Sequence, residues 1–306
     1  MGFSGQVTVE PTTLPYFSLQ SSSEISNVST EYLQKIIQLC ETQDISLVLT
    51  FLPFNASEAS QNDAGYVAEM AQEYGLDWID PNTLSEIINP DIDFANNYED
   101  NAHINLSGAH KLSYFIGNYL TSHYNLPDHR EDPAYASWNE YDAVYRETKQ
   151  QYLTAQTYAS SYLMLLADRD FDLVLSGLDS FLWDNPAYAE LLYNLGIDSE
   201  QVSDNPKTIV ISGSDRTVNY FHSPCSAGAS LDTAIGSISV QPAEDAGNML
   251  LLDSNEICSL AASDDPSVFS VVVIDHSTKT FVDQASFSKT SADIEVTRNE
   301  TARTGT

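Results

Sequence analysis

One stretch, Ile45-Ser46-Leu47-Val48-Leu49-Thr50-Phe51, decides the fold predicted for the first part of the chain. It is a nearly continuous apolar run that contains β-branched residues and is closed by a proline, which is typical of a strand covered on both faces. A helical pattern precedes it over 29–43. Another follows over 63–74 and ends at Gly75, before a short strand at 77–80. This order of elements indicates a parallel α/β domain.

The rest of the chain predicts a second α/β unit with a smaller sheet. Its strands are expected at 171–176, 207–212, 218–222, 249–252, 268–275 and 280–287, and they would form a mixed or antiparallel sheet. The polar end of the chain shows no period, so we expect disorder there. The predicted segments are an irregular connection (1–24), a first domain (25–130), a helical connector (131–165), a second α/β domain (166–288) and a disordered tail (289–306).

Composition and charge exclude several classes of function. The chain has 306 residues, of which 42% are hydrophobic, so it can bury a sizeable core. It carries 12 Lys and Arg against 44 Asp and Glu, a formal charge of −32. Such a surface repels phosphate backbones, so we expect no nucleic-acid partner. We find no secretory signal pattern and no apolar run of about 18 residues, so we expect no membrane contact from this chain.

The cysteines and histidines show no spacing that is typical of a metal site. Cys40, Cys225 and Cys258 form no C-x-x-C pair, and the six histidines form no H-E-x-x-H pattern. The acidic stretch 91–100 lacks the glycine and the spacing of an EF-hand loop. We therefore expect no metal and no cofactor. Whether Cys225 and Cys258 pair in an oxidising compartment stays open.

The segment most informative about chemistry is YEDNAHINLSGA, residues 98–109. It predicts an irregular loop that leads into a helix capped by Ser107. Asp100 and His103 lie three residues apart in this loop. A catalytic imidazole needs one ring nitrogen free to accept a proton and the other held by an acceptor, and a carboxylate three residues away on a turn can provide that hold. Asp100 and His103 are therefore the candidate catalytic residues, the alternative being that they only brace the loop.

The order of elements in 25–130, with its D-x-x-H block and the Asn105 and Gly108-Ala109 that follow, resembles the C-terminal half of an SGNH/GDSL-type hydrolase. It is most similar to the branch that accompanies membrane-bound O-acyltransferases in polysaccharide acetylation and D-alanylation. The resemblance implies a partial flavodoxin-like three-layer domain in the cell envelope or outside the cell. It also implies that Asp100 orients His103, the general base of an acyl transfer. The implied partners are an acylated glycan or small ester and a membrane-bound O-acyltransferase.

The nucleophile of that family lies in a G-D-S or G-S-S block well upstream of the D-x-x-H, and we find no such block. We therefore expect an N-terminally incomplete form that lacks its nucleophile serine. Ser212 and Ser214 flank a glycine after a predicted strand, but the order Gly-Ser-Asp differs from Gly-Asp-Ser. These two serines, like Ser57 and Ser60 after the 45–51 strand, are most simply turn and loop hydroxyls.

The second domain resembles the α/β modules of cell-surface glycan-modifying proteins and the interleukin-like EMT-inducer domain. The resemblance rests on 171–176 and on the apolar pair of strands at 271–275 and 281–283. It implies a binding or accessory role. The two functions predicted for the whole chain are therefore an SGNH-type esterase or O-acyltransferase of an envelope glycan and, as the alternative, a non-catalytic carbohydrate-binding or scaffolding protein with a degenerate hydrolase domain.

Overall fold

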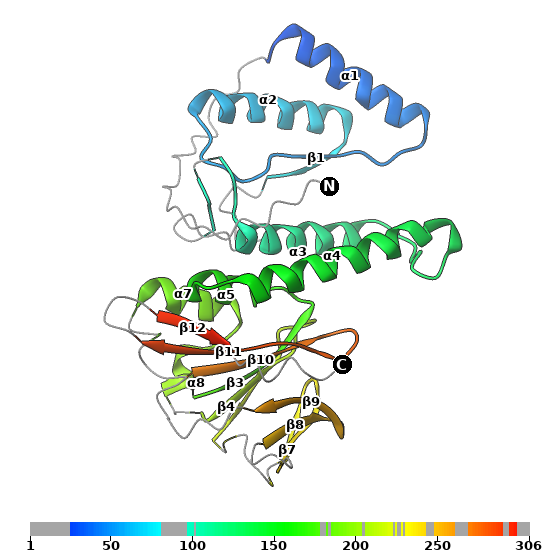
Figure 1. Ribbon diagram of the computed structural model, residues 1–306. Coiled ribbons are helices and arrows are strands. Elements are labelled where there is room, and N and C mark those ends of the chain that lie inside the picture. The colour runs from blue at the N-terminus through cyan, green and yellow to red at the C-terminus, as the bar shows by residue number, and fades with distance from the viewer. Residues whose placement is uncertain are drawn as a thin grey trace. The chain divides into compact units, whose positions relative to one another are not determined.

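The structure, a computed structural model, divides the chain into two compact units, Met1–Tyr124 and Asn125–Thr306. Both contain helices and strands, so the fold class is mixed α/β (Figure 1). The residues that the structure describes are 25–80, 97–100, 102–177, 182, 185–203, 206–222, 224, 228, 230–242, 248–260, 269–289 and 294–298.

The first unit contains a small parallel sheet with a helix between its two strands. Helix α2 ends at Gly75, which takes the left-handed conformation (φ 67°) that the sequence predicts for a residue closing a helix. Tyr124, just after α3, donates a hydrogen bond to Asp77 of β2 and so ties the last helix to the sheet. The elements are α1 (Asn27–Thr42), β1 (Val48–Thr50), α2 (Glu58–Tyr74), β2 (Asp77–Ile79) and α3 (Leu106–His123).

Strands β1 and β2 pair in parallel, with Val48 opposite Asp77 and Thr50 opposite Ile79. The parallel arrangement is as predicted. The prediction that 45–51 forms a strand covered on both faces is wrong, because the strand spans only Val48–Thr50 and none of its residues is buried. Ile45 is 55% exposed. The sheet has only two strands within the described residues, and two strands leave edges and faces that cannot enclose a whole apolar run.

The second unit joins helices to two antiparallel sheets. A short 3-10 turn and two of the described helices come first in the chain, the other described helices lie between the first and the second strand, and the remaining strands follow. The elements are η1 (Pro133–Tyr135), α4 (Ala136–Ala155), α5 (Ala159–Leu165), β3 (Phe171–Ser176), α7 (Pro186–Asn194), α8 (Ser199–Ser203), β4 (Thr208–Ile211), β5 (Val218–Phe221), β6 (Ser230–Thr233), β7 (Gly236–Pro242), β8 (Asn248–Leu252), β9 (Asn255–Leu260), β10 (Phe269–Asp275), β11 (Phe281–Lys289) and β12 (Ile294–Arg298).

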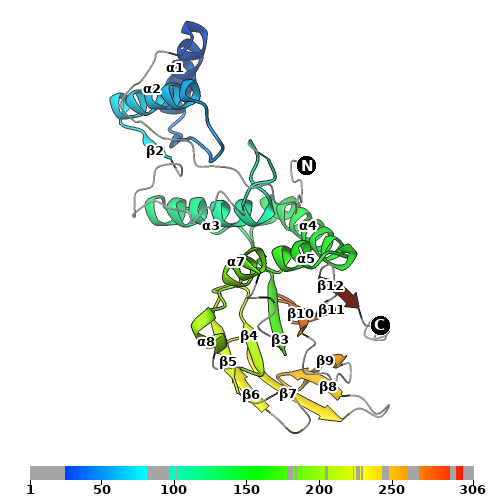
Figure 2. The same ribbon diagram turned by 90° about the vertical axis from the view of Figure 1, so that its left-hand side faces the viewer.

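The larger sheet of this unit has the strand order β12-β11-β10-β3-β4-β5, and the smaller has the order β6-β7-β8-β9. Helices α5 and α7 lie on one side of the larger sheet, and the smaller sheet lies on the other side (Figure 2). A buried apolar cluster lies between the two sheets and contains residues of both. Alternate residues of a strand point to the same face, so each sheet contributes one apolar face to this cluster. This cluster includes Val174, Val210, Val272, Ile274, Ile238, Val240, Leu250, Leu252 and Cys258.

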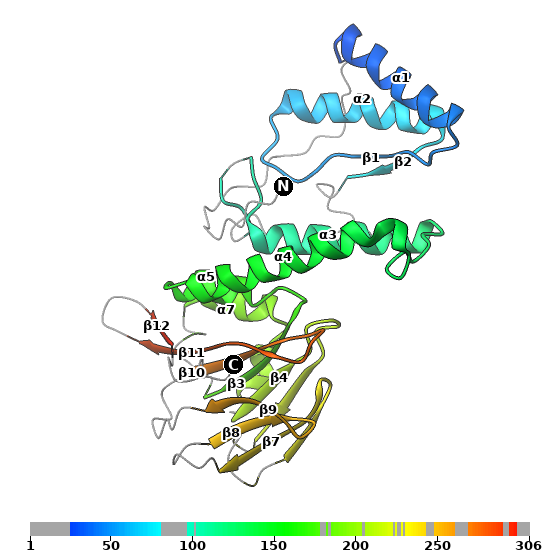
Figure 3. The same cartoon turned by 45° about the vertical axis from the view of Figure 1, so that its right-hand side comes forward.

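Two segments differ from their sequence-based description. The segment 131–165, predicted as a helical connector, is helical in α4 and α5 (Figure 3). Both helices belong to the second unit, and their residues Leu153 and Leu163 are buried. The tail predicted to be disordered contains β12, which pairs with β11. The side chain of Arg298 donates to the buried Asp283 (3.0 Å) and anchors this strand. The segment Ile294-Glu295-Val296-Thr297 alternates apolar and polar residues, a short strand signal that the expectation of disorder overlooked.

Two further expectations concern cysteines and membranes. Cys258 is buried on β9, whereas Cys225 lies outside the described residues, so their pairing stays open. Among the helices that the structure describes, none combines the length and the apolar character that crossing a membrane requires.

Candidate functional site

The candidate site is a loop just before helix α3, and the two ends of this loop pair with each other through the backbone. Tyr98 and Ile104 form an antiparallel bridge. The amide of Glu99 donates to the carbonyl of His103 (3.0 Å), and the amide of Asn105 donates to the carbonyl of Asn97 (2.9 Å). Tyr98 is fully buried, so the base of the loop is fixed while its tip is exposed. Backbone pairing therefore sets the spacing of the side chains at the tip.

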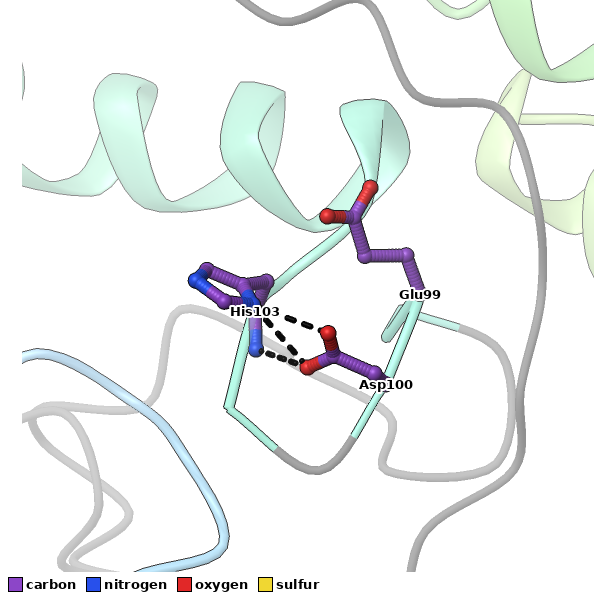
Figure 4. A group of neighbouring side chains, drawn as sticks. All are labelled: Glu99, Asp100 and His103. Atoms are coloured by element: carbon purple, nitrogen blue, oxygen red, sulfur yellow. Dashed lines mark hydrogen bonds and ion pairs between the residues drawn. The ribbon is translucent and has the colours of Figure 1, made fainter.

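At the tip, Asp100 holds His103 by three hydrogen bonds (Figure 4). The ring nitrogen Nδ1 of His103 lies 2.9 Å from Oδ2 and 3.1 Å from Oδ1 of Asp100, and the His103 amide donates to Oδ1 (2.8 Å). The amide of Ala102 also donates to this oxygen (2.6 Å). The sequence prediction that the two residues meet is confirmed by this geometry, since a short turn brings a carboxylate back onto residues two and three positions later.

The helix that follows the loop begins differently from the prediction. Asn105, not Ser107, is the N-cap of α3, because its side chain accepts the amide of Gly108 (3.1 Å). Asn105 is buried, so the cap also fills the base of the loop. Gly108 lies so close to Asn97 that a Cβ would approach the Asn97 carbonyl oxygen to 2.6 Å. The glycine thus allows the helix start to pack directly on the loop.

The hydrogen bond between the two side chains shifts the pKa of each. The contact with the His103 ring, followed by the amide of Ala102, lowers the pKa of Asp100. Asp100 in turn raises the pKa of His103 above its ordinary value of 6.5. The carboxylate therefore favours the protonated imidazole. The side chains of His103 and Asp100 are 68% and 48% exposed, so solvent screens much of this effect.

The other side of the imidazole has no hydroxyl partner within the described residues. Among those residues, Asp100 is the only one whose side chain hydrogen-bonds the His103 ring, and it does so at Nδ1. Ser57 is instead the N-cap of α2, and its hydroxyl lies 3.0 Å from that of Ser60. Ser212 and Ser214 belong to the second unit, where their hydroxyls lie 3.3 Å apart. Each candidate serine thus has a local structural role, as the sequence suggests.

Glu99 adds a third ionisable side chain to the loop. One of its oxygens lies within 4.8 Å of ligand atoms of Asp100 and His103. Its negative charge is a further, smaller reason for the raised pKa of His103. The sequence analysis did not single out this residue. Its signal was its position beside the D-x-x-H block on a turn that brings neighbouring side chains together.

A second aspartate–histidine pair, which the sequence analysis missed, lies in the other unit. Asp172 of β3 is fully buried, and it accepts hydrogen bonds from His276 Nδ1 (2.6 Å) and Lys279 Nζ (2.6 Å), which follow β10. The amide of Gly213, after β4, also donates to it (2.7 Å). The available signal was an aspartate inside an apolar strand, because a buried carboxylate requires partners. Its partners are far away in sequence and could not be named.

Comparison with protein-family models, with curated proteins and with solved structures yields no match.

Proposed function

We propose that Asp100 and His103 are the acid–base half of an SGNH-type esterase or O-acyltransferase that acts on a cell-envelope glycan. One observation carries the proposal: Asp100 holds one ring nitrogen of His103 at 2.9 Å, while the ring itself is largely open to solvent. This is the arrangement in which an imidazole keeps a fixed tautomer and can still exchange a proton with a substrate. The function class rests on the resemblance of the D-x-x-H block.

In the proposed reaction, the free nitrogen of His103 accepts the proton of a hydroxyl group. The hydroxyl oxygen then forms a bond to the acyl carbon of an ester. The bond from this carbon to the leaving oxygen breaks, and the imidazolium returns its proton to that oxygen. Asp100 stabilises the imidazolium between the two steps. The attacking hydroxyl would belong to a serine outside the described residues or to water.

The finer features of the proposal follow from the resemblance. A partial flavodoxin-like fold is supported by the parallel pairing of β1 and β2 around α2. The substrate would be an acylated glycan or a small ester. A membrane-bound O-acyltransferase would be the partner, and the protein would act in the cell envelope or outside the cell.

The test compares two histidines that each face an aspartate three residues away. His129 Nδ1 lies 3.4 Å from Asp132 and is the matched control. With the full chain and 4-nitrophenyl acetate, we expect His103→Ala to abolish turnover above the buffer rate, because the base held by Asp100 is removed. We expect His129→Ala to keep it. Equal turnover in the His103 variant and the unaltered chain, or no turnover by the unaltered chain, would overturn the proposal.

A second candidate, a non-catalytic carbohydrate-binding protein, is favoured by exposed aromatic side chains on and after α4. Trp138, Tyr141 and Tyr158 are 73%, 68% and 68% exposed. Flat aromatic faces of this kind can stack on sugar rings. This candidate predicts that Trp138→Ala weakens the binding of the protein to glycans on an array, whereas His103→Ala leaves this binding unchanged. Binding that both variants retain would contradict it.

A further inference from the structure

Within the described residues, one group of His, Cys, Asp and Glu side chains has the compactness of a metal site. Glu99, Asp100 and His103 each offer one ligand atom, and these atoms all lie within 4.8 Å of one another. All three come from a single loop, and Figure 4 shows the carboxylates of Glu99 and Asp100 on opposite sides of the His103 side chain. The loop is closed by the hydrogen bond between Glu99 and His103 main chains, so the three ligands approach together.

Glu99 supplies an independent reason to expect a cation. Its Oε2 atom is buried and has no hydrogen-bond partner among the described residues. A buried carboxylate oxygen without a partner is costly, because it has lost its water and gained nothing in return. Asp100, by contrast, is satisfied by the amides of Ala102 and His103 and by the ring. A cation beside Glu99 would supply the missing partner.

The distances suit a small ion after a short adjustment. Bonds of about 2.1 Å from zinc to nitrogen or oxygen place neighbouring ligands of a tetrahedron roughly 3.4 Å apart. His103 Nδ1 and Asp100 Oδ2 are now 2.9 Å apart, at the separation of a shared proton. They would move slightly apart to admit the ion, and Glu99 would move inward. Both movements are rotations of partly exposed side chains.

The ligand types select the ion. An imidazole nitrogen suits Zn²⁺ and other first-row transition ions better than it suits Mg²⁺ or Ca²⁺, which prefer a cage of oxygen atoms. Two carboxylates with a neutral imidazole carry two negative charges, which match a divalent ion. The chain's formal charge of −32 raises the local concentration of such ions. Three protein ligands also leave a position for water.

We propose that Glu99, Asp100 and His103 bind one divalent transition-metal ion, with Zn²⁺ as the best match. The ion takes the place of the proton between His103 Nδ1 and Asp100. Binding by itself does not depend on the proposed esterase function. One consequence does rest on that function: the ion removes the hydrogen bond that orients the base, so Zn²⁺ inhibits turnover.

The test is a calorimetric titration of zinc chloride into the full chain after treatment with EDTA and desalting. We expect one site in the unaltered chain, and at least a tenfold weaker affinity in Glu99→Gln. Glu73→Gln, on the exposed face of α2, removes the same charge elsewhere and should leave the affinity unchanged. His103→Ala should also abolish the site. In NMR spectra, Zn²⁺ should shift the ring signals of His103 and leave those of His129 in place.

Two results would overturn the site. One is an affinity for Zn²⁺ that is equal in Glu99→Gln and the unaltered chain, which would mean diffuse binding to an acidic surface. The other is calcium binding as tight as zinc binding and unchanged in His103→Ala. Because the titration needs no turnover, its failure is distinct from failure of the esterase proposal. In the ester assay, Zn²⁺ that binds but does not lower turnover would overturn the inhibition alone.

Discussion

The two units each hold an aspartate against a histidine, but in opposite surroundings. Asp100 and His103 are three residues apart and their side chains are 48% and 68% exposed. Asp172 and His276 are 104 residues apart, and their side chains are 0% and 32% exposed. Both contacts run from a carboxylate to Nδ1, at 2.9 and 2.6 Å. The same pair of groups is thus a turn motif in one unit and a tertiary contact in the other.

The difference separates a pair available for chemistry from a pair that holds the fold. At the exposed pair, water can replace either partner, so the contact contributes little to stability and the ring can reach a substrate. At the buried pair, the carboxylate is closed to bulk solvent and is held by Gly213, His276 and Lys279, which come from two different turns. Removing one partner there leaves buried polar groups unpaired. The predictions below test this division.

The largest effect is expected at the buried pair. Asp172→Asn keeps the size of the side chain and removes its charge, so we expect the second unit to lose about 3 kcal/mol of stability. The two units make global unfolding an ambiguous measure. Amide hydrogen exchange of β3 and β10 therefore gives the readout. The matched Asp100→Asn change should leave exchange in those strands unaltered. Equal protection of β3 in both variants would show that the two pairs do not differ as described.

A smaller effect is expected where α3 packs on the exposed pair's loop. Gly108→Ala places a Cβ against the carbonyl oxygen of Asn97, and overpacking of this kind costs about 2 kcal/mol. We expect faster amide exchange at the start of α3 and a weaker contact between Asp100 and His103. Gly117→Ala, in the same helix with no atom within 4 Å of the added Cβ, should instead stabilise it by about 0.8 kcal/mol. Identical exchange in both variants would refute the packing argument.

The smallest effect is a shift in the titration of His103. Asp100 favours the protonated ring, so the base form becomes available only as the pH rises through a pKa above 6.5. Asp100→Asn removes that preference, and the midpoint should fall toward 6.5. Ring signals followed by NMR with EDTA present measure it without requiring activity. Asp132→Asn, beside His129, should leave the His103 midpoint in place. A midpoint that is the same in the Asp100 variant and the unaltered chain would exclude the Asp100 carboxylate as a cause of the raised pKa, because the smaller effect of Glu99 remains in both.

Local features could be predicted wherever the partners are close in sequence. The end of α2 at Gly75 and the meeting of Asp100 with His103 depend on residues within one turn of each other, and both predictions are confirmed. The cap of α3 was misassigned by two residues, because Asn105 and Ser107 are both good caps and the choice depends on how the loop packs. The burial of the 45–51 strand was mispredicted. An apolar run shows that a segment tends to be buried, but actual burial also requires neighbouring strands that cover it.

By itself, the sequence determined six strands of the second unit (β3, β4, β5, β8, β10 and β11), the acidic charge and the turn that joins Asp100 to His103, whereas β6, β7, β9 and β12 were not predicted. These follow from short-range sterics, hydrogen bonding and composition. Only the tertiary structure decided that β12 pairs with β11, that Asp172 meets His276, and that Glu99 lies beside the imidazole with a buried oxygen that no described residue hydrogen-bonds. Such contacts depend on which strands pair and which atoms lose water, and no local pattern encodes either.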